Sequence, residues 1–413
     1  MVRLPCFKLR GQPVETKFET LFFNRVNQQY KPVKLDNLLA QHLLITGVTG
    51  SGKSTTALSI MMGMKAFHQN LIILDPTGEY QSIPNSRRVV LGRDSFLDVN
   101  HLNANEIGKM LDITHPQLLS KLPLAIESLQ ISRNVLKSTA VYKKIDRTRD
   151  NHQFNLKRLR IANKDFDLNL IADQLIEEFV IPRNDDKADF TLLGQQYDQD
   201  TIQSVWSDLE TLRLALRSLK VTELPEDSSD NHIVHYDVGY LINLFVTHRA
   251  SEQSLIIDLS EYANDIHLSQ TLIDILTREV MINRQRFPKK FPVVVFIDEA
   301  HRYLPKVIAS DNGIFSILRE GRKIGVDLML STQSPLDLSA KLIGQFGSFI
   351  CHCLGSPEEV DVLPPALQKS RLELMALPVG EAFLKTANSS DVTLVQITPA
   401  SVEHNTNNIS FDI

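Results

Sequence analysis

The run GVTGSGKS at residues 47–54 limits what this chain can fold into more than any other feature. It matches G-x-x-x-x-G-K-[ST] at each fixed position. An apolar stretch, 43–46, precedes it and a helix-forming stretch begins at Ser54, so the loop lies where backbone N–H groups converge at a helix N-terminus. Glycines let the chain wrap a triphosphate, Lys53 supplies positive charge to the outer phosphates, and the Ser54 hydroxyl can bind Mg2+. The predicted cofactors are ATP and Mg2+, and the candidate nucleotide-binding residues are Gly47, Thr49, Gly50, Ser51, Gly52, Lys53, Ser54 and Thr55.

Short apolar runs recur along the chain and indicate an α/β fold with a mainly parallel sheet flanked by helices. Several runs are almost entirely apolar, as strands covered on both faces are. Helices are expected over 54–67 and 269–286, the second with Ser269 as its N-cap. The expected strands are 43–46, 71–75, 254–259, 293–298, 327–332 and 348–353.

The periodicity becomes helical from about residue 100 to residue 220. We interpret this block as an inserted helical subdomain, 100–230, that ends in the polar loop 225–230. The remaining chain divides into a short β-rich arm, 1–40, an ATPase core, 41–99 with 231–400, and a polar tail, 401–413. One predicted apolar stripe of the insertion consists of Ile202, Val205, Trp206, Leu209, Leu212 and Leu216.

A second motif, PVVVFIDEAH at 292–301, delivers two adjacent carboxylates at the end of an apolar strand. Adjacent side chains at a strand end point in different directions, so the two acids can take different tasks. We expect Asp298 to face the metal shell and Glu299 to act on a water that attacks the γ-phosphate. Helix capping by the two acids is the alternative interpretation.

Two further candidates follow the acidic pair in sequence. Gln333 ends the apolar run LMLSTQ and is a candidate for sensing the γ-phosphate or orienting water; the alternative is an ordinary polar residue at a strand end. Arg322 lies in the cationic run REGRK and is a candidate arginine finger, a cation supplied across a subunit interface to the transition state. A solvated helix end would carry the same charges without this task.

These motifs together resemble the HerA/FtsK superfamily of DNA-pumping ATPases, and HerA specifically. The resemblance rests on HLLITGVTGSGKS at 42–54, LDPTGEY at 74–80, IDEAH at 297–301, EGRKIG at 320–325 leading into STQ, and LPVGEA at 377–382. It implies a RecA-like core assembled as a homo-hexameric ring around double-stranded DNA, with ATP bound between neighbours.

The same resemblance implies roles for individual residues. Asp75 and Glu79 would lie near the phosphates, Glu299 would activate water, Gln333 would act as the sensor, and Arg322 would reach the neighbour's ATP. An aspartate that caps the loop before Pro76 is the alternative for Asp75.

Three departures from the family pattern are visible. Gln41 stands where HerA proteins usually have an arginine, and Ser334 follows the sensor position where they often have another. HerA proteins also begin with a long β-barrel, whereas about 40 residues here precede the strand that leads into the phosphate-binding loop (P-loop), residues 47–54. We expect a barrel reduced to a strand or two around 14–23, or its absence, with another protein on that face.

The chain is acidic overall, since 44 Lys and Arg oppose 49 Asp and Glu for a net charge of −5. Any nucleic-acid binding must therefore come from a local basic surface. Residues 143–164 hold eight cations against two anions and form the candidate DNA-binding segment; solvated helix faces are the alternative. Its cations are Lys143, Lys144, Arg147, Arg149, Lys157, Arg158, Arg160 and Lys164.

Three cysteines cannot all pair, which favours a reducing compartment. The run CHC at 351–353 lacks zinc-site spacing, so we interpret it as a strand with small buried thiols. No signal core or bilayer-length apolar window is present, and we expect an unanchored, cytoplasmic protein.

Three functions are compatible with these patterns. The leading hypothesis is a ring-forming ATPase that translocates double-stranded DNA, working with a separate effector protein such as a nuclease or a defence effector. The second is an ATP-regulated scaffold that assembles and controls an effector in anti-phage defence without pumping DNA. A P-loop phosphotransferase is third, and it is disfavoured because a kinase has little use for a water-activating Glu299.

Overall fold

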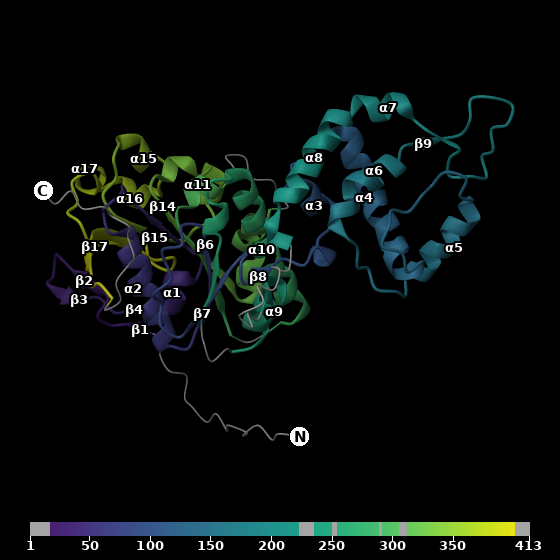
Figure 1. The fold of residues 1–413 in the computed structure, drawn as a ribbon. Coiled ribbons are helices and arrows are strands. Elements are labelled where there is room, and N and C mark those ends of the chain that lie inside the picture. Colours follow the sequence, from purple (N-terminus) through teal and green to yellow (C-terminus); the bar gives the residue numbers. More distant parts are fainter. Residues whose placement is uncertain (1–16, 223–234, 250–253, 289–290, 305–311, 401–413) are drawn as a thin grey trace, which may run out of the picture. The chain divides into compact units, whose positions relative to one another are not determined.

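The computed structural model places the chain in two compact units, which are described separately (Figure 1). One unit comprises residues 1–89 with 240–413, and the other comprises residues 90–239. The predicted loop 225–230 and tail 401–413 lie outside the described residues. The described ranges are 17–222, 235–249, 254–288, 291–304 and 312–400.

The first unit is built on an eleven-stranded sheet. Its strands are β2 (Phe22–Asn24), β3 (Gln29–Tyr30), β5 (Leu43–Thr46), β6 (Asn70–Asp75), β7 (Ser86–Val90), β12 (Ser254–Asp258), β13 (Val293–Ile297), β14 (Val326–Thr332), β15 (Ser348–Cys351), β16 (Glu381–Lys385) and β17 (Val392–Ile397). They lie in the order β3-β2-β17-β16-β15-β5-β14-β13-β6-β12-β7. The six expected strands are all present, each within two residues of its expected ends.

Six neighbouring strands, β15-β5-β14-β13-β6-β12, are parallel, which confirms the mainly parallel α/β fold. Thr46 of β5 is in register with Thr332 of β14 and with Cys351 of β15. Leu74 of β6 likewise aligns with Ile297 of β13. The loops that follow these strands therefore all emerge at the carboxyl edge of the sheet, where open α/β sheets bind ligands.

An antiparallel extension completes the sheet beside β15. Strand β16 pairs antiparallel with β15 and β17, and β17 pairs antiparallel with β2. Strand β2, near the start of the described chain, thus lies beside β17, near its end. A separate two-stranded ladder joins β1 (Lys17–Phe18) to β4 (Val33–Lys34). Strands β1 and β2 lie where one or two strands are expected around 14–23. Residues 14–16 of that range are outside the described chain.

Helices surround this sheet, and the two expected ones are present (Figure 1). Helix α2 (Lys53–Ala66) follows the P-loop, and its Ala57, Ile60 and Met61 belong to the main buried cluster. Helix α10 (Ile266–Arg286) has its N-cap at Asp265, four residues before the predicted N-cap. The other helices of this unit are α1 (Leu35–Leu39), α11 (Ala300–Tyr303), α12 (Gly313–Ser316), α13 (Arg322–Ile324), α14 (Ala340–Ile343), α15 (Pro357–Asp361), α16 (Pro365–Gln368) and α17 (Arg371–Leu374), with α9 (Val238–Thr247) at the unit boundary.

The prediction of Ser269 as an N-cap is wrong. Asp265 caps α10, because its Oδ1 accepts a hydrogen bond from Leu268 N at 2.9 Å. Ser269 is buried inside the helix, where its hydroxyl donates to the Tyr262 carbonyl at 2.7 Å. Both residue types are good caps, and the apolar periodicity did not locate the first turn.

The second unit is mostly helical. Its helices are α3 (Ala104–Met110), α4 (Pro116–Gln130), α5 (Arg149–Leu159), α6 (Ile171–Glu177), α7 (Gln199–Ser204) and α8 (Trp206–Ser218), with a π-helical turn at Ile131–Val135. Short ladders pair β8 (Ser95–Phe96) with β11 (Tyr236–Asp237) and β9 (Val180–Ile181) with β10 (Gln196–Tyr197).

The predicted apolar stripe of this unit is correct only in part. A turn at Val205 separates α7 from α8. Val205, Leu209, Leu212 and Leu216 are buried, whereas the Trp206 side chain is 46% exposed. Trp206 therefore does not belong to the buried face of α8.

Candidate active site

The P-loop joins the end of β5 to the start of α2 and is shaped by its glycines. Gly52 has φ +112°, a conformation that a residue with a Cβ rarely adopts. A Cβ on Gly47 would lie 2.6 Å from the Cβ of His352, so only glycine fits beside that side chain. The loop thus depends on these glycines for its backbone path as well as for close approach to a phosphate.

Lys53 occupies the first turn of α2 and is almost fully buried, with 5% of its surface exposed. Its Nζ donates a hydrogen bond to the carbonyl of Val48 within the loop, at 3.1 Å. Burial lowers the pKa of Lys53, and the nearby Glu299 and Asp298 carboxylates oppose that shift. The Lys53 ammonium, at the N-terminus of α2, can form charge-assisted hydrogen bonds with a phosphate. Ser54 and Thr55 follow in the same turn, and Thr55 is exposed.

Asp298 follows β13 directly and is buried, with 1% of its surface exposed. Its Oδ1 accepts a hydrogen bond from Glu299 N at 2.8 Å, and its Oδ2 accepts one from the Tyr80 hydroxyl. The Tyr80 ring in turn stacks edge-on against Phe296, with ring centroids 5.3 Å apart. Asp298 is therefore held at both oxygens by the protein itself.

A chain of side chains connects Glu299 to the P-loop. The Glu299 Oε2 atom accepts a hydrogen bond from Gln333 Nε2 at 2.9 Å. Gln333 Oε1 accepts one from Thr49 Oγ1 at 3.0 Å. The structure thus brings together three candidate residues from three separate motifs.

The backbone at Glu299 supports this placement. Glu299 has φ +49°, in the left-handed region that non-glycine residues rarely adopt and that often marks functional sites. His301 Nδ1 lies 3.2 Å from Glu299 Oε2, although without the geometry of a hydrogen bond. The strained turn presents the carboxylate toward Gln333 and away from the regular start of α11.

The turn after β6 is organised around Asp75. Its Oδ1 accepts from Gly78 N at 2.8 Å and from Thr77 Oγ1 at 3.1 Å, and its Oδ2 accepts from Tyr80 N at 2.9 Å. These contacts favour the alternative in which Asp75 caps its own loop. Burial raises the pKa of Asp75.

Glu79 stands on the same turn, and its pKa is raised to about 7. Burial is the main cause, and the carboxylates of Asp298, Asp75 and Glu299 add to it. Negative charge therefore accumulates at this edge of the sheet. A divalent cation with oxygen ligands would relieve that charge, so the donor set fits Mg2+, with Ser54 and Asp298 as the residues that would hold it.

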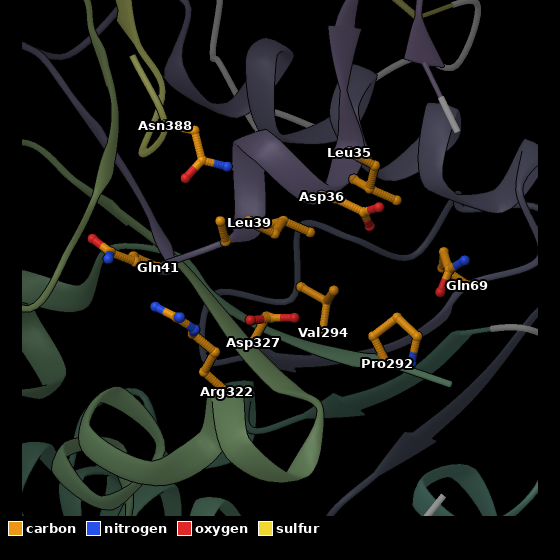
Figure 2. Close-up of a pocket in the computed structure, with 11 residues that line it drawn as sticks. Leu35, Asp36, Leu39, Gln41, Gln69, Pro292, Val294, Arg322, Asp327 and Asn388 are labelled. Carbon is orange, nitrogen blue, oxygen red and sulfur yellow. The ribbon is translucent and has the colours of Figure 1, made fainter. Parts of the chain in front are cut away.

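Arg322 lies at the opposite edge of the sheet, just before β14, whereas Gln333 lies just after it. Seven residues of strand separate the two edges by roughly 20 Å. Arg322 lines a cavity of about 360 Å³ together with Gln41, Asp36 and Asp327, and its exposed side chain extends into it (Figure 2). The arginine therefore lies far from the P-loop of its own chain.

Asp327 shares this cavity and has a pKa raised to about 7. Burial is the main cause, the Asp36 carboxylate adds to it, and the Arg322 guanidinium opposes it. His42 contacts two segments at the same edge. Its Nε2 lies 3.2 Å from the Leu318 carbonyl, and its Nδ1 accepts a hydrogen bond from Leu328 N at 3.0 Å. Leu318 belongs to the π-helical turn Ile317–Gly321 that directly precedes Arg322.

Two residues of the site were not selected from the sequence. Tyr80 belongs to the motif LDPTGEY with no predicted role of its own, and His352 is predicted only as part of a strand with buried thiols. That strand ends at Cys351, and His352 follows it at the carboxyl edge, beneath the P-loop. Neither residue has a local sequence signal for its role, because each makes its contact across the sheet.

The candidate DNA-binding segment contains one cation that does not fit the prediction. Lys144 is buried, and its Nζ forms an ion pair with Glu178, whose side chain is 1% exposed. Arg147 stacks on the Tyr142 ring at 4.1 Å and is partly buried. The remaining cations are exposed, namely Lys143, Arg149, Lys157, Arg158, Arg160 and Lys164.

A parallel sheet with a P-loop, a buried aspartate and a glutamate at one edge defines a RecA-like P-loop ATPase. The chain belongs to the HerA helicase family, since the family model "Helicase HerA, central domain" matches residues 25–280, more than half of the chain. Within the described residues, no helix has the length and apolar character needed to cross a membrane.

Known proteins resemble the chain over most of its length. It is 23% identical to a probable DNA double-strand break repair helicase HerA of Methanocaldococcus jannaschii, over 88% of this chain and 72% of the relative. It is also 23% identical to the DNA double-strand break repair helicase HerA of Saccharolobus solfataricus, over 85% of this chain and 63% of that relative. The structure of the plasmid coupling protein TrwB in complex with ADP and Mg2+ aligns with a TM-score of 0.55 at 14% identity, covering 91% of this chain and 89% of TrwB.

Proposed function

We propose that the chain is a ring-forming ATPase that couples ATP hydrolysis to translocation of double-stranded DNA. The observation that carries the hydrolytic part is the Thr49–Gln333–Glu299 bridge. It places a carboxylate and an amide beside the loop that would hold the γ-phosphate. Glu299 then accepts a proton from the attacking water, and Gln333 orients that water and responds to the phosphate.

The P-loop residues bind and orient the nucleotide. Lys53 and the loop N–H groups neutralise the phosphate oxygens, with Gly47, Thr49, Gly50, Ser51, Gly52 and Thr55 forming the cradle. Mg2+, when bound through Ser54 and Asp298, supplies charge that stabilises the phosphate oxygens. Glu79 lies among the same carboxylates and would respond to that cation, and Asp75 maintains the turn that carries Glu79.

A second copy of the chain is needed to complete the site. Arg322 lies at the edge of the sheet opposite its own P-loop, and it is exposed. In a closed homo-hexameric ring, one subunit's Arg322 edge would face the next subunit's P-loop. Arg322 then acts in trans as an arginine finger. Gln41 lines the Arg322 cavity, so the position where the family usually has an arginine would also lie at this interface.

DNA would be contacted by local basic surfaces, because the chain is acidic overall. The HerA relatives are named as DNA double-strand break repair helicases. The exposed cations of 143–164 are the proposed phosphate contacts, with Lys144 removed from the set. A separate effector, such as a nuclease or a defence protein, would use the motor.

The alternative is that the ring acts as an ATP-regulated scaffold that assembles and controls a defence effector without pumping DNA. The exposed apolar residues Phe154, Ile161 and Phe190 of the helical unit are the observation that favours it, since an effector that binds over them would remove their apolar surface from water.

The test measures ATP turnover and assembly mass of the purified chain with and without duplex DNA, over a range of salt concentrations. The motor predicts oligomers and turnover that duplex DNA raises and salt reduces. Glu299→Gln should keep ATP binding and lose hydrolysis, whereas Lys53→Ala should lose binding. ATP turnover that is unchanged by DNA but changes with a co-purifying protein supports the scaffold hypothesis. Wild-type hydrolysis by Glu299→Gln contradicts the role of Glu299 as the base that accepts the proton of the attacking water.

A further inference from the structure

His352 lies in the interior beneath the P-loop and joins three segments that are distant in sequence. Its side chain is fully buried. Its Nε2 lies 2.9 Å from Thr56 Oγ1 in the first turns of α2, and its Nδ1 lies 2.9 Å from the Glu381 carbonyl at the start of β16. The imidazole therefore connects the helix that follows the P-loop to the antiparallel part of the sheet.

The chemistry of the partners fixes the state of this ring. A carbonyl oxygen can only accept, so His352 Nδ1 must carry the proton and donate to Glu381. Nε2 is then the acceptor for the Thr56 hydroxyl. Burial lowers the pKa of His352 to about 4, and the Lys53 ammonium acts in the same direction. The neutral Nδ1–H tautomer is thus maintained at neutral pH.

The segments around His352 also hold the P-loop backbone. The carbonyl of Cys353 accepts from Val48 N at 2.8 Å, and Gly380 N donates to the carbonyl of Ser51 at 3.0 Å. The His352 Cβ occupies the space that a side chain on Gly47 would need. The loop is therefore fastened at two backbone points to the residues that flank His352 and Glu381.

We propose that His352 is a positioning residue for nucleotide binding, which holds Thr56 and thereby the first turn of α2 that presents Lys53 and Ser54. Thr56 faces the core, so its hydroxyl is available for this contact and does not compete for phosphate. The role is distinct from hydrolysis, because Glu299 and Gln333 are held by other strands.

The two hydrogen bonds of the ring can be separated by substitution. His352→Asn keeps a donor near the Nδ1 position for Glu381 but loses the acceptor for Thr56. His352→Gln reaches the Nε2 position and keeps that acceptor. Thr56→Val removes the hydroxyl at nearly constant shape, and Thr56→Ser retains it. His42→Asn is the matched control, because His42 is an equally buried histidine at the opposite edge of the sheet.

The measurement is the dissociation constant for Mg2+-ADP by titration calorimetry, with urea unfolding of the nucleotide-free protein and steady-state ATPase kinetics on the same samples. His352→Asn and Thr56→Val should each weaken ADP binding by up to about tenfold, the value reached if the whole free energy of this buried hydrogen bond serves to hold the turn that binds the phosphates. The double variant should be no weaker than either single one, since both remove the same contact. His352→Gln, Thr56→Ser and His42→Asn should bind ADP like the wild type. The kcat of the His352 and Thr56 variants at saturating ATP should remain within about twofold of the wild-type value.

Two results would overturn the proposal. One is wild-type ADP affinity in Thr56→Val, which is decisive even where the His352 variants do not fold. The other is a lower unfolding midpoint in His352→Asn with an unchanged dissociation constant, which would leave the histidine with a purely structural role. These results are independent of whether the protein moves DNA, because ADP binding is measured without DNA and the residues that hold Thr56 belong to the same chain.

Discussion

The hydrogen bond between Tyr80 and Asp298 makes a quantitative prediction for Tyr80→Phe. Tyr80 and Asp298 are 2% and 1% exposed, so water cannot replace the lost hydroxyl. Removing the hydroxyl leaves the charged Asp298 carboxylate as a buried acceptor without this hydrogen bond. Such a loss costs about 2 kcal/mol of stability. A loss of about 2 kcal/mol raises the population of the opened state about thirtyfold. Phenylalanine keeps the edge-on contact with Phe296, so the change isolates the hydroxyl.

Tyr303→Phe is the matched control for this experiment. Tyr303 is 1% exposed, and within the described ranges its hydroxyl has no hydrogen-bond partner. Removing that hydroxyl should leave stability unchanged or raise it, because an unpaired buried polar group is lost. The two substitutions are chemically identical, and only the partner of the hydroxyl differs.

Native-state hydrogen exchange of the nucleotide-free protein, followed in peptides that cover β6 and β13, provides the assay. Protection of these strands should fall about thirtyfold in Tyr80→Phe and remain unchanged or rise in Tyr303→Phe. Intrinsic fluorescence is unsuitable, since the single tryptophan, Trp206, lies in the other unit. Equal protection in the two variants would refute the reasoning, because it would mean that the Asp298 contact contributes nothing.

Three further predictions concern charged groups. Arg322→Ala should lose ATPase activity and regain it in mixed assemblies with a Lys53→Ala chain, whose Arg322 is intact; absence of rescue argues against action in trans. Lys144→Met should destabilise the helical unit by about 3–5 kcal/mol, because it leaves Glu178 buried without its cation. Trp206 fluorescence during urea unfolding measures this change. The control Lys143→Met, at an exposed position, should change stability by less than about 0.5 kcal/mol. Glu79→Gln should stabilise the nucleotide-free protein above pH 7. The pKa of Glu79 is raised in the folded state to about 7, so ionisation of this carboxyl opposes folding. The gain in stability should disappear below pH 4.5, where Glu79 is protonated in both the folded and the unfolded state, and a gain that persists there would contradict the assignment.

The parallel core and the P-loop could be predicted from sequence because each depends on local pattern. Apolar strands and a strand–loop–helix with fixed glycines leave periodic and positional signals. The register then places Asp298, Gln333 and the P-loop at one edge without further information, since parallel strands share that edge.

The residues that sequence reasoning missed are those whose partners lie far along the chain. Thr56 and His352 are 296 residues apart, and Tyr80 and Asp298 are 218 residues apart. A charge count likewise could not distinguish Lys144 from its exposed neighbours, because its partner Glu178 lies 34 residues later, at the C-cap of α6. The misplaced N-cap and Trp206 show that a correct helix assignment still leaves the first turn and the phase undetermined.

The position of β5 in the sheet has a consequence for biosynthesis. Its neighbours are β14 and β15, which begin at residues 326 and 348. Because β5 ends at Thr46, the strand that leads into the P-loop is made 280 residues before the first partner (326 − 46) and 302 before the second (348 − 46). During translation the apolar segment 43–46 has no neighbouring strand to pair with until most of the polypeptide has left the ribosome. Such long-range closure is slow, and the nascent chain should depend on chaperones until its last strands arrive.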